Sequence, residues 1–182
     1  MKRFSFSCIL PILLAACIST STEMPIQGLE ATAAQVRKGG YKNTTYLIEG
    51  QFVPLVDGFF EIESAPGSAT RITTRYFGNE AFGDLNGDGM EDVAFLLTQS
   101  SGGSGTFFYV AAAEQTETAF LGTNAVSLGD RIAPQTTSIE NGIITVNYAD
   151  RYPGEPFTVQ QSLGVSKYLR VIDNILIEVR KP

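Results

Sequence analysis

The sequence predicts a mainly β fold: a single antiparallel domain, sandwich or barrel-like, with at most one short helix near its N-terminus. From Thr44 onward, apolar and polar residues alternate with the period of two that marks half-buried strands. Two-residue turn signals such as Asn141-Gly142 recur between these segments. About ten candidate strands follow one another at intervals of roughly 8–15 residues, the spacing of sandwiches and barrels.

Residues 1–16 have the pattern of a secretory signal peptide. Met1-Lys2-Arg3 is basic, and the largely apolar run from Ile9 to Ala16 is too short to span a membrane. The motif Leu14-Ala15-Ala16-Cys17 resembles the lipobox of bacterial lipoproteins. That resemblance implies cleavage before Cys17 and lipidation of Cys17, and Ile18 in the next position favours the outer membrane. Plain cleavage and a retained apolar helix are the alternatives.

Residues 17–28 are rich in Ser and Thr, and we expect them to tether the lipid to a single folded domain at 29–182. Leu29 to Lys38 contains good helix formers and ends at Gly39-Gly40, which predicts a short helix or an ordered coil.

The first half of the domain has four candidate strands, at Thr45–Glu49, Gln51–Val56, Phe59–Glu63 and Arg71–Phe77. Asp57-Gly58 between the second and third predicts a type I′ hairpin. In the third strand, Phe60 and Ile62 are expected to face inward.

The stretch Asp84 to Asp92 reads Asp-Leu-Asn-Gly-Asp-Gly-Met-Glu-Asp, and we predict that it binds calcium. Calcium takes roughly 6–8 oxygen ligands, which alternate residues of a sharply turned loop can supply. Gly89 permits the turn because it lacks a Cβ. The predicted ligands are the side chains of Asp84, Asn86, Asp88 and Asp92 and the backbone carbonyl of Met90.

The twelfth position of this loop is Phe95, where an EF-hand has a bidentate Glu, so a full EF-hand is excluded. The spacing Asp-x-Asn-x-Asp-Gly-x-x-Asp resembles the calcium loops of FG-GAP and VCBS repeats and, more distantly, those of dockerins. Only one copy is present, so the propeller fold of those repeats is not implied. An ordinary Asn-Gly/Asp-Gly turn and another hard ion such as magnesium are the alternatives.

Two apolar segments, Asp92–Thr98 and Thr106–Ala113, follow the loop and are expected to pair as the core hairpin, because both are apolar on both faces. The calcium loop would then lie at the base of this hairpin and brace it. The Gly/Ser-rich segment 101–105 lacks the Gly-Lys-Ser/Thr ending of a phosphate loop and is interpreted as the hairpin tip.

Six further candidate strands are Thr118–Leu121, Ala125–Leu128, Ser138–Glu140, Ile143–Tyr148, Lys167–Ile172 and Ile175–Arg180. The last two pairs flank the turn signals Asn141-Gly142 and Asp173-Asn174. Between them, Tyr152-Pro153-Gly154-Glu155-Pro156 is interpreted as an exposed loop.

Composition excludes several classes of chemistry. The formal net charge is −6, and loss of Lys2 and Arg3 with the signal makes the mature chain more acidic, which argues against a nucleic-acid partner. There is no histidine, and both cysteines, Cys8 and Cys17, lie in the signal and at the lipidation site. The mature domain therefore has no Ser-His-Asp triad, thiol nucleophile, disulfide or histidine-ligated zinc site.

The stretch Asn43 to Ala113 also resembles a group of uncharacterised bacterial lipoproteins and secreted proteins. The resemblance is carried by Asp57-Gly58, by Phe82 to Gly89, by Gly102 to Phe107 and by Leu128 to Arg131. It implies a single folded module and no particular activity.

These observations predict a membrane-anchored lipoprotein of the bacterial cell envelope, held by the lipid on Cys17 and stabilised by structural calcium. We expect a non-enzymatic binding or scaffolding module with an envelope protein or glycan partner, and assign no catalytic residue. One alternative is a carboxylate-based hydrolase of envelope glycans. Its candidate carboxylates are Glu61, Glu63, Asp130, Asp150 and Glu155.

The other alternative is an inhibitor or accessory subunit of an envelope enzyme that docks through Tyr152 to Phe157. An aromatic binding surface would have to come from Tyr148, Tyr152, Phe157 and Tyr168. The pairs Asp130-Arg131 and Asp150-Arg151 are expected to bridge to other strands, because adjacent residues on a strand point to opposite faces.

Overall fold

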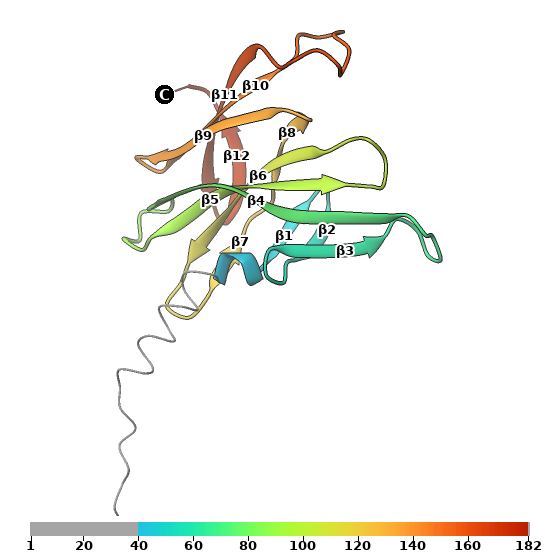
Figure 1. Ribbon diagram of the computed structural model, residues 1–182. Helices are drawn as coiled ribbons and strands as arrows, with labels where there is room; N and C mark the ends of the chain where they lie inside the picture. The colour runs from blue at the N-terminus through green and yellow to red at the C-terminus, as the bar shows by residue number, and fades with distance from the viewer. Residues whose placement is uncertain (1–39, 182) are drawn as a thin grey trace, which may run out of the picture.

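The computed structural model describes residues 40–181, and its regular structure there is antiparallel strands with one short 3-10 helix (Figure 1). The predicted signal peptide, Cys17, the tether and the helix predicted at 29–38 lie outside the described residues. The elements are η1 (Gly40–Asn43), β1 (Thr45–Ile48), β2 (Gln51–Pro54), β3 (Phe59–Glu63), β4 (Arg71–Gly83), β5 (Asp92–Ser100), β6 (Phe107–Gln115), β7 (Phe120–Gly122), β8 (Val126–Asp130), β9 (Ala133–Glu140), β10 (Ile143–Asp150), β11 (Leu163–Ile172) and β12 (Ile175–Val179). Within this part of the chain, no helix is long and apolar enough to cross a membrane.

The strands form three antiparallel sheets. The largest has the order β3-β4-β5-β6-β7, and β8 also pairs with β6. The second has the order β12-β11-β10-β9, and the third is the β1-β2 pair. The prediction of a mainly β, antiparallel, sandwich-like single domain is confirmed.

The hairpin β5–β6 is the centre of the fold, and the prediction of a core hairpin at this place is confirmed. Both strands are buried on both faces because their neighbours cover them from two sides. Toward the β9–β12 sheet they contribute Ala94, Leu96, Phe108, Val110 and Ala112. Toward η1, β1 and β2 they contribute Val93, Phe95, Leu97, Tyr109, Ala111 and Ala113. The molecule thus has two apolar cores that share one sheet.

The turn Asp57-Gly58 has the positive φ angles expected of a type I′ turn, but the hairpin predicted across it does not form. Only Val56 and Phe59 pair beside it, after which β2 joins β1 and β3 joins β4. The reason is packing against the turn itself. The Gly58 amide donates to the Lys42 carbonyl, and the Gly58 carbonyl accepts from the Tyr76 amide, so the two strands leave in different directions.

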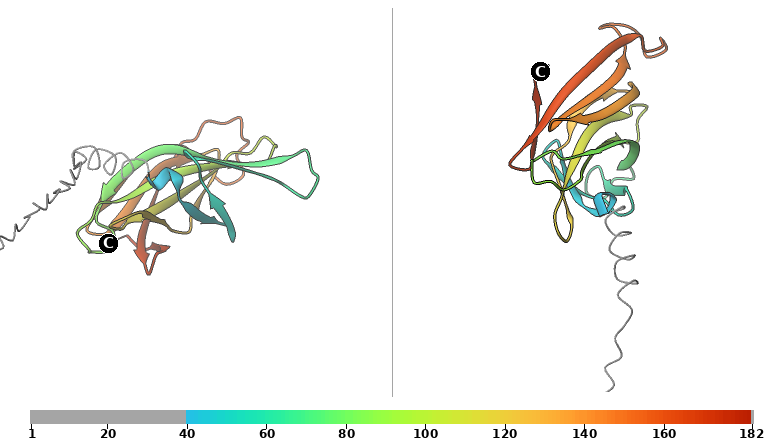
Figure 2. Two further views of the ribbon diagram at one scale, coloured as in Figure 1. Left: turned by 90° about the horizontal axis from the view of Figure 1, so that it is seen from below. Right: turned by 90° about the vertical axis from the view of Figure 1, so that its left-hand side faces the viewer.

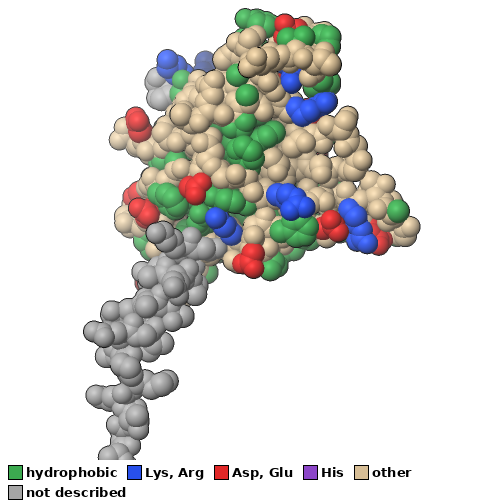
Figure 3. All heavy atoms as spheres, viewed as in Figure 1, with side chains coloured by type: hydrophobic (Ala, Val, Ile, Leu, Met, Phe, Trp, Pro, Cys, Tyr) green, Lys and Arg blue, Asp and Glu red, His purple; other side chains and the backbone are tan. Residues whose placement is uncertain are grey.

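The β3–β4 hairpin extends away from the rest of the domain (Figures 1 and 2). Both Phe60 and Ile62 are expected to face inward. Phe60 does pack against the core, as Tyr76 does, but Ile62 is exposed. The two side chains lie on the same face of the strand, as alternation predicts. The core ends before Ile62, so the described part of the chain leaves that side chain partly uncovered. Charged side chains of both signs gather over this arm (Figure 3), where Arg71 lies beside Glu61 and Glu63.

The two C-terminal hairpins form at their predicted turns, with positive φ at Asn141 and Gly142 and at Asp173 and Asn174. The edge strand β12 is bound to the segment between β7 and β8 through the side chain of Asn124. The Asn124 amide nitrogen donates to the Leu176 carbonyl at 2.9 Å, and its oxygen accepts from the Leu176 amide at 2.7 Å. One carboxamide therefore satisfies both backbone groups of a buried residue on an edge strand.

Candidate functional site

The predicted calcium loop, residues 84–92, joins β4 to β5, and Gly83, the residue before it, pairs with Asp92 in the sheet. Gly87 and Gly89 have φ angles of 86° and 82°, a region that residues with a Cβ rarely adopt. Leu85 is buried and packs into the core between the two large sheets. The loop is therefore fixed to the body of the domain by its second residue as well as by its ends.

Asp92 holds the start of the loop and the neighbouring strand together. Its side chain is fully buried, and one carboxylate oxygen accepts from the Leu85 amide at 2.8 Å while the other accepts from the Gln115 amide at 2.7 Å. Burial raises the pKa of this carboxyl above its ordinary value, and the charges of Asp88 and Asp84 add to the rise. The two amide hydrogen bonds act in the opposite direction. Asp92 is thus a structural brace as well as a predicted metal ligand.

The other three side-chain ligands lie at the exposed surface and hydrogen-bond to the loop itself. Asp84 accepts from the Gly87 and Gly89 amides at 2.7 and 3.0 Å. Asn86 accepts from the Asp88 amide, and Asp88 accepts from the Met90 amide at 2.7 Å. The backbone amides thereby turn the carboxylates and the carboxamide toward the loop, which shapes it independently of any ion.

Glu114, near the end of β6, joins this acidic group and is not among the residues predicted from the sequence. Its neighbour Ala113 pairs with Val93, which places Glu114 beside Asp92 at the same end of the hairpin. Burial raises the pKa of the Glu114 carboxyl, and the charges of Asp92 and Asp88 raise it further. A hydrogen bond with Asn86 acts in the opposite direction and lowers this pKa. Extending the predicted pairing by one residue would have brought Glu114 to this position.

The donor set fits a hard cation by its chemistry, because carboxylate, carboxamide and carbonyl oxygens are the ligands that calcium prefers. Within residues 40–181, no three acidic side chains converge closely enough to be recognised as a metal-holding group. Asp84, Asn86, Asp88, Met90 and Asp92 nevertheless share one short loop whose glycines allow the sharp turn such a site needs. These five residues would hold the ion.

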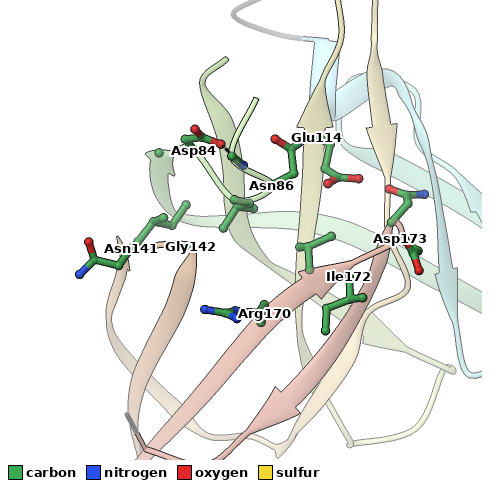
Figure 4. Close-up of a pocket in the computed structure, with 14 residues that line it drawn as sticks. Asp84, Asn86, Glu114, Asn141, Gly142, Arg170, Ile172 and Asp173 are labelled. Atoms are coloured by element: carbon green, nitrogen blue, oxygen red, sulfur yellow. Dashed lines mark hydrogen bonds between the residues drawn. The ribbon is translucent and has the colours of Figure 1, made fainter. Parts of the chain in front are cut away.

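A groove of about 860 Å³ adjoins the loop, and we call it the loop groove. It is lined by residues 83–87, by Glu114, by the β9–β10 turn and by residues 170–174. Figure 4 shows Asp84, Asn86 and Glu114 on one side of it and Arg170 on another, between the turn at Asn141-Gly142 and Asp173. Four segments that are distant in sequence therefore meet at this end of the sandwich.

The β9–β10 turn packs directly on the loop. A Cβ on Gly142 would lie 3.3 Å from the Leu85 carbonyl oxygen, and a Cβ on Gly83 would lie 2.8 Å from Cγ2 of Ile139. Gly142 thus lies close to the backbone of Leu85, and Gly83 close to the side chain of Ile139. This packing on the second sheet positions the wall of the loop groove that Asp84 and Asn86 form.

None of the five carboxylates proposed for a glycan hydrolase lines the loop groove. Glu61 and Glu63 lie beside Arg71 on the extended arm. Asp150 accepts from the Arg151 amide, and Glu155 accepts from the Tyr152 amide.

Asp130 bonds to its own neighbour Arg131 at 2.9 Å, so the prediction that this pair would bridge to another strand is wrong. The strand ends at Asp130 and Arg131 has a φ of 52°, which removes the alternation on which the prediction relied. Burial by itself would raise the pKa of Asp130, but the contacts with Arg131, the Thr106 amide and Arg151 lower it below its ordinary value.

The four aromatic residues considered for a binding surface are separated. Tyr148 is buried in the core and Tyr168 is partly buried on β11, whereas Tyr152 and Phe157 are exposed between β10 and β11. Phe157 lies against two guanidinium groups, 3.6 Å from that of Arg131 and 5.4 Å from that of Arg151. The Phe157 ring thus serves to hold the loop to the end of β8, and no four-residue aromatic platform forms.

Comparison of the chain with models of protein families, with curated proteins and with solved structures finds no match.

Proposed function

We propose that this chain is a membrane-anchored lipoprotein of the bacterial cell envelope whose 84–92 loop binds structural calcium, and that it works as a binding module. The anchor is the lipid on Cys17, and the outer membrane is the proposed location. The partner is a protein or glycan of the envelope, and no nucleic acid is involved.

The observation that carries the calcium proposal is the concentration of acidic oxygens where β4, β5 and β6 meet. Asp84, Asp88 and Asp92 lie in one short loop, and Glu114 lies beside it. Burial is the main cause of the raised pKa values of Asp92 and Glu114, and the negative charges of the neighbouring carboxylates raise them further. A divalent cation would relieve that repulsion and draw the loop oxygens together. Its role would be to stabilise the base of the core hairpin.

Calcium is expected to raise the melting temperature of the purified full-length chain. Extracellular modules bind calcium with a dissociation constant of roughly 10⁻⁴–10⁻³ M, so about 10 mM calcium would add roughly 1.4–2.7 kcal/mol. For a domain of this size that corresponds to a rise of roughly 3–10 °C, measured by circular dichroism in calcium and in chelator.

Two variants make the test specific to the ligands. Asp88→Ala is expected to abolish the calcium-dependent rise, whereas Glu91→Ala removes a charge from the same loop without removing a predicted ligand and should keep most of it. Identical melting curves of the unsubstituted chain in calcium and in chelator would refute the calcium proposal. Magnesium in place of calcium tests the alternative ion.

Cys17→Ser is expected to release the chain from the membrane fraction of cells that otherwise hold it there. Several acyl chains anchor firmly, since each buried methylene contributes about 0.8 kcal/mol, and the hydroxyl of serine cannot carry the same thioether-linked lipid. Fractionation and intact-mass measurement check this. A membrane-bound, unlipidated Cys17→Ser chain would contradict the anchor.

One observation bears on the hydrolase alternative: Glu114 has a raised pKa and lines a groove that also contains Asp84 and Asp173. A raised carboxyl pKa is what a general acid needs. Among residues 40–181, however, no aromatic side chain lines the loop groove, so this part of the chain offers a sugar ring no stacking surface there. The binding role is therefore better supported. Release of reducing ends from envelope glycan by the unsubstituted chain, but not by Glu114→Gln, would reverse this order.

A further inference from the structure

The loop groove carries charges of both signs in separate places. Asp84 and Glu114 lie on the side of the 84–92 loop, and Arg170 projects from β11 (Figure 4). At about 860 Å³ the groove falls within the range of small-ligand sites. It is therefore large enough for a ligand that contacts both regions at once.

Arg170 is the basic side chain among the described residues that line the groove. Its side chain is exposed and makes no hydrogen bond or ion pair with any residue in the range 40–181. Arg71 and Arg131, by contrast, lie beside carboxylates within this range. A guanidinium presents parallel donors that match a carboxylate, so an unpaired arginine in a groove is suited to that group.

The rest of the lining narrows the class of ligand. Three carboxylates, those of Asp84, Glu114 and Asp173, would repel a polyanion such as a nucleotide. The absence of aromatic side chains from the lining disfavours a neutral sugar. Asn141 and Asn174 add carboxamides, and the half-exposed Ile172 adds an aliphatic surface. Such a lining suits a peptide, which carries amides, aliphatic groups and charges of both signs.

We propose that the loop groove binds a short peptide with a free terminal carboxylate and a cationic side chain. Arg170 receives the carboxylate, and the side formed by Glu114 and Asp84 receives the cation. The proposal rests on the proposed role as a binding module. It does not require calcium in the loop, because Arg170 and Glu114 are not among the predicted ligands, whereas Asp84 is one of them and a bound ion would offset part of its charge.

The test is calorimetric titration of the full-length chain with three probes. The first is acetyl-Ala-Lys-Ala with a free C-terminus, the second is its C-terminal amide, and the third has norleucine in place of lysine. Loss of either charge from the peptide is expected to weaken binding about tenfold, because each removes a charged hydrogen-bonded contact.

Substitutions in the protein should reproduce the same pattern. Arg170→Gln is expected to weaken binding of the acid about tenfold and to leave the amide unaffected. Glu114→Gln should weaken binding of the lysine peptide and leave the norleucine peptide unaffected. Arg180→Gln is the matched control, because Arg180 is also exposed and lies outside the groove. Melting curves of each variant verify that it is folded.

Equal affinity for the three probes, no binding of the first probe, or unchanged binding by Arg170→Gln would each overturn the proposal. Displacement of the peptide by a neutral chitin trisaccharide of equal or higher affinity would also overturn it in favour of a glycan. Titrations in calcium and in chelator keep the two proposals apart. Peptide binding without a calcium-dependent melting shift would refute only the calcium loop, and the converse result would refute only the groove.

Discussion

The Asp92→Ala chain is expected to lose at least about 1–3 kcal/mol of unfolding free energy, because one buried backbone donor is left unpaired and a second, partly buried donor also loses its partner. Those donors are the amides of Leu85 and Gln115, which belong to the loop and to β6. The measurement is urea unfolding in chelator, so that a bound cation makes no contribution. A calcium ligand alone would show no effect under that condition, whereas a structural brace would.

Asp92→Asn separates the charge of this residue from its hydrogen bonds. Asparagine keeps one acceptor oxygen and the size of the side chain, so it should keep part of the stability that alanine loses. If Asp92→Ala unfolds within about 0.5 kcal/mol of the unsubstituted chain, the range of ordinary surface substitutions, then the two hydrogen bonds do not brace the loop.

Phe95→Ala is expected to destabilise the domain by about 3–5 kcal/mol, the usual range for removing a buried aromatic side chain. Phe95 is completely buried, and its ring centroid lies 5.4 Å from those of Tyr41 and Tyr46 and 5.5 Å from that of Tyr76. The resulting cavity would open between the central sheet and the layer formed by η1 and β1. Urea unfolding gives the size of the loss.

Phe52→Ala is the matched control for this prediction. Phe52 belongs to β2 of the same half of the molecule but is 73% exposed, so its removal should change stability by less than about 0.5 kcal/mol. Equal losses for the two variants would show that the aromatic cluster around Phe95 is not the centre of this core.

The elements that the sequence predicts well are those specified by neighbouring residues. Asn141-Gly142 and Asp173-Asn174 are turns whose backbone angles depend on the residues themselves, and both hairpins form there. The hairpin β5–β6 is recognisable because apolar residues on both faces require cover on both faces. In each case local chemistry and global packing favour the same structure.

The predictions that fail depend on distant residues. Asp57-Gly58 turns as expected, but contacts with Lys42 and Tyr76 decide which strands pair beyond it. Arg131 folds back on Asp130 because its backbone leaves the strand conformation, which the spacing alone does not indicate.

One part of the candidate site can be predicted from the sequence and another part cannot. The loop ligands are adjacent in sequence and could be named from it. The loop groove could not be predicted from the sequence. Glu114 and Arg170 come to line it only because β6 and β11 pair within two different sheets.

Asn124 covers one place at which a further strand could add to the edge of the second sheet. An edge strand offers unpaired backbone groups to any strand that approaches, which is a common route to aggregation. On β12, Ile175 and Ile177 are exposed and apolar, so the strand would otherwise attract a second chain. Leu176 lies between these two residues, and its N–H and C=O groups are both hydrogen-bonded to the carboxamide of Asn124. A strand that pairs with β12 at this position would have to displace both hydrogen bonds. A chain concentrated on a membrane surface by a lipid would gain from such protection.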